Sequence, residues 1–171
     1  MKRLLFILFL LAAFCLAACK GGDGRQPSAA KTAGVAPDFV LRDITGNKVQ
    51  LSQYRGKIIV LEFWATWCPP CKATVPELIA LQDKYAAKGL VVVGIALDEG
   101  EGSQSKVSAF SKGHKINYPL LLGDENVSKS YGVFSIPATF LIGRDQKIIT
   151  AYKGYVDGLE GLLSKEIDKN I

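Results

Sequence analysis

Several features that mark other classes of protein are missing from this chain of 171 residues. Its 21 lysines and arginines are scattered, and no basic run is interleaved with aromatic residues. Because such clustering is typical of nucleic-acid-binding surfaces, we expect no nucleic-acid partner. The sequence also has no internal repeat and no second domain boundary. Its length is that of one folded domain with an appendage.

Long apolar runs are confined to the first eighteen residues, where Lys2 and Arg3 precede an apolar run that ends at Ala18. This run is shorter than the roughly 20 residues of a transmembrane helix, and the pattern is typical of a signal peptide. The residues from Leu16 to Cys19 resemble a bacterial lipoprotein box. That resemblance implies that Cys19 becomes the lipidated first residue of the mature protein. An ordinary secretory signal with an incidental Cys19 is the alternative.

Three segments are therefore expected. Residues 1–18 form a lipoprotein-type signal peptide, residues 19–36 a lipidated tether, and residues 37–171 the folded domain. We predict a flexible tether because it is rich in Gly, Ala, Ser and Lys and nearly without large apolar side chains. The protein is expected in the cell envelope, anchored to a bacterial membrane through its lipid and facing the periplasm or the exterior. The sequence leaves open which membrane carries it.

Cysteine and histidine are scarce in the part that would remain. Once Cys15 leaves with the signal peptide and Cys19 is lipidated, Cys68 and Cys71 are left, with His114 as the one histidine. A structural zinc site usually takes four such ligands, whereas copper binding by two soft sulfurs stays an alternative. A disulfide across two residues closes too small a loop to stabilise a fold much. We expect a reactive pair, with no metal and no cofactor beyond a Cys68–Cys71 redox disulfide.

The hydrophobic pattern predicts alternating strands and helices. Residues 58–64 and 90–97 are near-continuous β-branched and apolar runs, as in a sheet covered on both faces. A helix is expected behind the cysteines, with Gly89 at its end. Shorter strands are predicted at residues 39–41, 48–51, 118–122, 138–143 and 147–153.

Three further helices have recognisable end signals. A helix at residues 103–112 is followed by Gly113, which suits a C-terminal cap. Asp124 is the expected N-cap of a short helix. Asp157, with Glu160 three residues later, predicts a capping box at the start of the last helix.

The two cysteines lie between the buried strand and the helix, as a thiol–disulfide centre requires. A helix N-terminus stabilises a thiolate, so Cys68 is the expected exposed nucleophile and Cys71 the resolving thiol. Pro69 and Pro70 between them have no N–H and remove two donors that would stabilise the thiolate. This favours a reducing or intermediate potential over that of a strong oxidant. Both prolines are also expected to border the bound substrate.

Glu62 is the one ionisable residue in the run 58–64. Burial raises the pKa of a carboxyl group, and such a group could exchange a proton with Cys71. We therefore predict that Glu62 is a proton relay whose replacement by glutamine slows turnover. A structural ion pair is the alternative, although the neighbouring strand 90–97 offers no cation.

Pro137 follows Ile136 and precedes a predicted strand. Proline is sterically tolerated at the first residue of a strand, and a cis peptide bond beside the cysteines is the functional interpretation. The backbone of Ile136 could then pair with an extended substrate segment. Trp67, Phe134 and Ile136 are the predicted apolar rim of the substrate site. Trp64 is expected in the core.

The stretch from Glu62 to Cys71 resembles the active site of thioredoxins, and Pro137 with the following residues resembles their cis-proline strand. The opening residues 36–39 and the insert between residues 98 and 131 look like the TlpA/ResA/DsbE branch of membrane-tethered bacterial oxidoreductases. This resemblance implies a thioredoxin-like α/β fold: a central mixed sheet flanked by helices, with an N-terminal β-hairpin and a central insert. It also implies thiol–disulfide oxidoreductase activity of the protein-disulfide reductase type.

The same resemblance implies the partners. They are thiols and disulfides of exported proteins, with apocytochrome c as a candidate, and a membrane reductant of the DsbD/CcdA type. Thr74 stands where ResA-type members have a glutamate, and the dipeptide Pro69-Pro70 replaces their usual Glu-Pro. Glu62 is expected to take the place of the missing acid.

Two other functions stay open. Peroxiredoxins share the wider fold, but their peroxidatic cysteine has a proline seven residues before it and a threonine three before, where this chain has Leu61 and Ala65. A non-catalytic adaptor is the alternative of another class, and the intact pair Cys68 and Cys71 argues against it.

Overall fold

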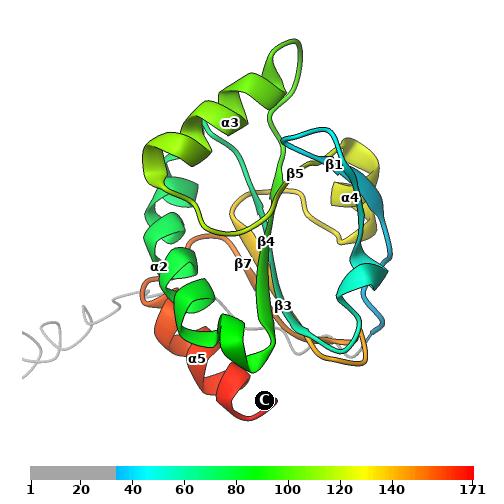
Figure 1. The fold of residues 1–171 in the computed structure, drawn as a ribbon, viewed down its shortest axis with the longest axis vertical. Coiled ribbons are helices and arrows are strands. Elements are labelled where there is room, and N and C mark those ends of the chain that lie inside the picture. Colours follow the sequence, from blue (N-terminus) through cyan, green and yellow to red (C-terminus); the bar gives the residue numbers. More distant parts are fainter. Residues whose placement is uncertain (1–33) are drawn as a thin grey trace, which may run out of the picture.

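The computed structural model describes residues 34–171 (Figure 1). The predicted signal peptide, Cys19 and the tether up to residue 33 lie outside this range. The strands are β1 (Val40–Asp43), β2 (Lys48–Gln50), β3 (Ile58–Trp64), β4 (Leu90–Ala96), β5 (Leu120–Leu122), β6 (Ala138–Ile142) and β7 (Ile148–Lys153). The helices are α2 (Pro69–Tyr85), α3 (Ser103–His114), α4 (Glu125–Ser130) and α5 (Leu159–Asp168), with 3-10 turns η1 (Leu51–Tyr54) and η2 (Ala86–Lys88). No helix in the described range is long and apolar enough to cross a bilayer.

One mixed sheet forms the centre of the molecule, with the strand order β2-β1-β5-β4-β3-β6-β7. The pairs β3–β4 and β4–β5 are parallel, whereas the remaining pairs are antiparallel. Every residue of β3 and β4 is buried, because the sheet is covered on both faces. The mixed sheet, the hairpin β1–β2 and the insert with α3, β5 and α4 confirm the predicted architecture.

The two faces of the sheet have separate apolar cores, since successive side chains of a strand point to opposite faces. Val60 and Trp64 of β3 pack into a core shared with α2, α3 and α5. Leu61 and Phe63 pack on the opposite face, which α4 covers. Figure 1 shows α2, α3 and α5 on one side of the sheet and α4 on the other. By this alternation, Glu62 lies on the face under α2.

The folded part begins before residue 37, the expected boundary. Val35 forms an antiparallel bridge with Lys147. Ala36 is 4% exposed and donates its N–H to the carbonyl of Gln146 at 2.8 Å. These two residues were expected in the tether, but they satisfy backbone groups of the β6–β7 turn. Val35 and Ala36 therefore belong to the folded domain.

The structure confirms one predicted helix end and places another elsewhere. Asp124 caps α4 as predicted, since its carboxylate accepts the N–H three residues further on at 2.8 Å. Gly113 does not end α3, which continues through it to His114 and closes at Lys115 in the left-handed conformation (φ 54°). The His114 ring stacks on Phe110 at 4.0 Å between centroids, a contact that favours the extension of the helix by two residues.

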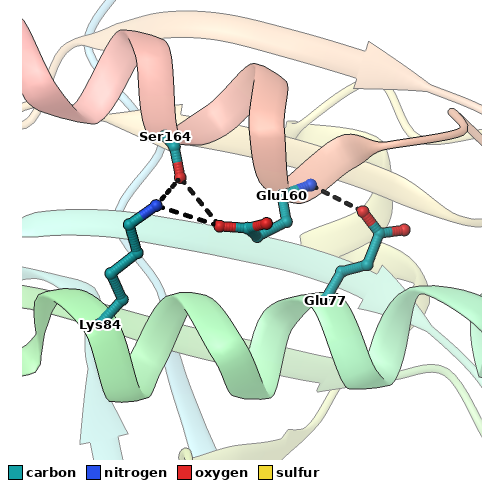
Figure 2. A network of polar contacts seen from close by, with 4 residues as sticks. All are labelled: Glu77, Lys84, Glu160 and Ser164. Atoms are coloured by element: carbon teal, nitrogen blue, oxygen red, sulfur yellow. Dashed lines mark hydrogen bonds and ion pairs between the residues drawn. The ribbon is translucent and has the colours of Figure 1, made fainter.

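The predicted capping box of α5 is wrong. Gly158, not Asp157, occupies the N-cap position, and it has a left-handed conformation (φ 68°). The carboxylate of Glu77 in α2 accepts the Glu160 N–H at 2.7 Å instead, while Lys84 of α2 forms an ion pair with the Glu160 side chain at 3.2 Å (Figure 2). The helix that follows the cysteines therefore supplies the cap of the last helix.

This tertiary cap gives a stability prediction. Glu77→Ala leaves the Glu160 N–H without its acceptor and is expected to lower the free energy of unfolding by about 1 kcal/mol. Glu77→Gln is the matched control, because its amide oxygen can still accept that bond and the loss should be smaller. Urea denaturation of the three proteins measures the difference. Equal stability of Glu77→Ala and the wild type would contradict the cap.

Candidate active site

The cysteine pair lies at the junction between the end of β3 and the start of α2. Cys68 is the N-cap residue of α2 (φ −90°, ψ 107°), and Pro69 and Pro70 occupy the first helical positions. Proline suits these positions, since their N–H groups have no intrahelical partner. Cys68 and Cys71 form a disulfide with their Cα atoms 5.3 Å apart. The Cys71 N–H donates to Cys68 Sγ at 3.3 Å, whereas the two prolines offer no donor.

Cys68 is less accessible than predicted. Its exposed fraction is 3%, against 0% for Cys71. Both cysteines belong to the apolar core between the sheet and α2, so the expectation of an exposed nucleophile is wrong for the disulfide form. Cys68 is still the more accessible of the two. Pro69 and Pro70 beside it are exposed.

Asp98 holds the loop that leads into the cysteines. It follows β4 and is 8% exposed. Its carboxylate accepts the backbone N–H of Thr66 at 2.9 Å and also the Thr66 hydroxyl. In the sequence, Asp98 marks only the edge of the predicted insert. Its position directly after a strand parallel to β3 was the available signal, because parallel strands end at the same edge of a sheet.

Glu62 lies in the middle of β3 and is 1% exposed. Its Oε1 atom is 2.5 Å from the hydroxyl of Thr74, in α2. The Oε2 atom has no hydrogen-bond partner among the described residues. None of the ion pairs found in residues 34–171 includes Glu62. The alternative of a structural ion pair is therefore not seen here.

Burial governs the acidity of this carboxyl group. Loss of hydration raises the pKa of Glu62, the hydrogen bond from Thr74 lowers it, and the negative charge of Glu77 raises it, so that together they bring it to about 8. A group with this pKa can give up and take up protons near neutral pH. The predicted raised pKa of Glu62 is confirmed in direction, and its role as a proton relay stays a prediction.

A groove of about 380 Å³ is lined by Trp67, the residue that precedes Cys68. Its lining joins the segment before Cys68 to the segment before Pro137: Trp67, Leu97, Glu99, Val133, Phe134, Ser135 and Ile136. Phe134 is 90% exposed and Trp67 64% exposed, which is unusual for large apolar side chains. Trp64 is 1% exposed, as expected for a core residue.

The Ile136–Pro137 peptide bond is cis, which agrees with the functional interpretation of Pro137. Pro137 itself is buried, whereas Ile136 is half-buried and lines the groove. The structure thus brings the predicted rim residues together and adds Leu97 and Glu99, which the sequence did not single out. Within the described range, no three His, Cys, Asp or Glu side chains gather in an arrangement that could hold a metal ion.

The known proteins that resemble this chain match it over most of its length. The sequence model of the AhpC/TSA family matches residues 33–151. Thiol-disulfide oxidoreductase ResA from Bacillus thuringiensis subsp. konkukian is 37% identical over 121 residues, which cover 70% of this chain and 68% of that protein. The protein of the same name from Bacillus subtilis is 35% identical over 120 residues, covering 70% and 65%. A crystal structure assigned as thiol:disulfide interchange protein DsbE from Chlorobium tepidum matches with a TM-score of 0.74 at 31% identity, covering 84% of this chain and 99% of that one.

Proposed function

This chain belongs to the AhpC/TSA family as a thioredoxin-like thiol–disulfide oxidoreductase, and we propose that it is a lipid-anchored reductant of disulfides in exported proteins. The observation that carries the proposal is the Cys68–Cys71 disulfide at the start of α2. This pair sits at a helix N-terminus, and Trp67, the residue before Cys68, lines a groove of about 380 Å³.

The proposed reaction moves two electrons from the dithiol to a client disulfide. The Cys68 thiolate attacks one client sulfur, so that a mixed disulfide forms and the other client sulfur leaves as a thiolate. Cys71 then loses its proton and attacks Cys68 Sγ, which releases the second client sulfur and leaves the Cys68–Cys71 disulfide. Both protons of the dithiol end on the client thiols. We assign Glu62 the part of accepting the Cys71 proton and passing it on.

We infer the direction of electron transfer from the small number of backbone N–H donors that face Cys68 Sγ. A thiolate at a helix N-cap is stabilised by backbone N–H groups of the first turn. Here Pro69 and Pro70 supply none, and Cys71 is the one residue of the three after Cys68 with an N–H aimed at the sulfur. A weakly stabilised thiolate makes the reduced form less favourable, which suits a donor of electrons rather than a strong oxidant.

Clients are proposed to bind along the groove. Trp67 and Phe134 offer apolar surface, and the backbone of Ile136, beside the cis bond to Pro137, borders the groove and could hydrogen-bond to a client strand. Glu99 adds one negative charge to the same lining. We propose polypeptides with apolar residues near their cysteines as clients. Apocytochrome c is the candidate that the family resemblance implies, and a DsbD/CcdA-type membrane protein is the proposed source of electrons.

The location is proposed from the N-terminal sequence. Cys19 follows a signal-peptide pattern and would carry the lipid. Residues 20–33 would link it to the fold, which begins by Val35. This tether would keep the active site at the outer face of a bacterial membrane, where exported proteins acquire their disulfides.

A trapping variant tests this proposal. Cys71→Ser can attack a client through Cys68 but cannot release it, so mixed disulfides with exported proteins should accumulate in the native envelope. These adducts should disappear on treatment with dithiothreitol, and mass spectrometry identifies them. The matched control is the Cys68→Ser/Cys71→Ser double variant, which should trap nothing.

The identity of the trapped proteins shows which clients the protein reduces. Cytochrome c or its assembly factors would support the narrow role, and a broad set of exported proteins would point to general disulfide reduction. If Cys71→Ser traps no more protein than the double variant, the proposed reductant function is wrong.

A further inference from the structure

The Thr74 hydroxyl lies within hydrogen-bond distance of two oxygen atoms, one of Glu62 and one of Cys71. Thr74 is 1% exposed and belongs to the first turns of α2. Its Oγ1 atom is 2.5 Å from Glu62 Oε1 and 2.7 Å from the carbonyl oxygen of Cys71. A hydroxyl group has a single hydrogen to donate. It therefore cannot donate to both neighbours at once.

Counting hydrogens shows which protonation state satisfies this arrangement. A backbone carbonyl only accepts, so the contact with Cys71 requires the Thr74 hydrogen. The contact with Glu62 is then satisfied only if the carboxyl group carries a proton and donates it to Thr74 Oγ1. Glu62 Oε2 has no partner in the described part of the chain, which is far less costly for a neutral acid than for a buried carboxylate. The geometry thus fits a protonated Glu62 in the disulfide form.

We propose that Thr74 is a positioning residue whose single hydroxyl hydrogen turns from the Cys71 carbonyl to Glu62 when Glu62 gives up its proton. This inference rests on the relay role of Glu62 proposed above. In the protonated state the chain of donors runs from Glu62 through Thr74 to Cys71. In the ionised state Thr74 becomes the donor to the Glu62 carboxylate and lowers the cost of its charge.

No other group described around Glu62 favours its charge. Glu77, which lies on α2 as Thr74 does, repels a negative charge on Glu62. Tyr118, which precedes β5, is itself buried, and its pKa is raised by burial and by the Glu62 charge. The facing residues of the neighbouring strands, Gly94 and Thr139, carry no charge. Thr74 is therefore the group on which an ionised Glu62 depends.

The test is a pair of substitutions that differ in the hydroxyl group. Thr74→Val keeps the shape of threonine without the hydroxyl, and Thr74→Ser keeps the hydroxyl. The Glu62 carboxyl is titrated by ¹³C NMR in the oxidised full-length protein, with its signal assigned by its loss in Glu62→Gln. Because a hydrogen bond to a charged group is a strong one, Thr74→Val should raise the Glu62 pKa by about one to two units. Thr74→Ser should leave it within about half a unit of the wild type.

The pH profile of client reduction supplies a second readout. The pH at which the rate rises with Glu62 ionisation should move upward in Thr74→Val by the same amount as the NMR pKa, and not in Thr74→Ser. If Thr74→Val does not fold, Thr74→Ala is titrated in its place. A Glu62 pKa that stays or falls without the hydroxyl overturns the proposal.

The two proposals fail separately. The titration needs no client, so a missing set of trapped proteins overturns the reductant function without changing the NMR result. Normal trapping by Cys71→Ser together with an unmoved Glu62 pKa in the valine variant overturns the role of Thr74 alone.

Discussion

Replacing Cys68 by serine is expected to reduce the catalysed reduction of insulin by dithiothreitol to the background rate, a loss on the order of 10³-fold or more. The reaction requires a sulfur that can attack a disulfide and later be displaced. A serine hydroxyl has nearly the same shape but does not ionise at neutral pH, so the first bond never forms. Insulin turbidity against time, with wild type and variant at equal concentration, measures the loss.

Cys71→Ser separates this attack from a general loss of structure. Both variants break the disulfide and leave one sulfur in the core between β3 and α2. Cys71→Ser should still form a mixed disulfide with a small reporter disulfide, whereas Cys68→Ser should form it far more slowly because Cys71 has no exposed surface. Equal insulin rates for wild type and Cys68→Ser would instead favour the non-catalytic adaptor.

Local patterns predicted most of the fold because they report on burial and chain direction. The runs at residues 58–64 and 90–97 became β3 and β4 with almost the same limits, since a fully buried strand must be apolar along its whole length. The cap at Asp124 was also predictable, because its acceptor and donor lie three residues apart. The cap of α5 was not, because Glu77 lies 83 residues from the N–H that it binds.

Some residues of the candidate site could likewise be predicted from the sequence, and others could not. The cysteines, Glu62 and Pro137 could be selected from motif and polarity alone. The contact of Thr74 with Glu62 crosses from a helix to the strand beneath it, and the sequence showed Thr74 only as a missing glutamate. The accessibility of Cys68 could not be predicted, because a position at a helix N-cap does not determine which residues pack over the sulfur.

Glu62 should give the oxidised protein an unusual dependence of stability on pH. Its pKa is about 8 in the folded state and near 4.5 when unfolded, so between these values the folded state holds a proton that the unfolded state has lost. By linkage, the free energy of unfolding falls as the pH rises through this window and levels off above pH 8. The fall is on the order of 5 kcal/mol. Asp38 and Asp43 have lowered pKa values, so their contributions change below this window.

Glu62→Gln removes the titrating proton and should flatten the curve. The amide is neutral at every pH, but it has donors for which the site around Oε2 offers no acceptor, so the variant should be slightly less stable than the wild type below pH 4.5. Above pH 8 the order should reverse, because the wild type then carries a buried charge. Urea denaturation of both oxidised proteins from about pH 4 to pH 9 locates the crossing. Parallel curves would show that Glu62 does not titrate in this window, and a proton relay at neutral pH would then have no group to perform it.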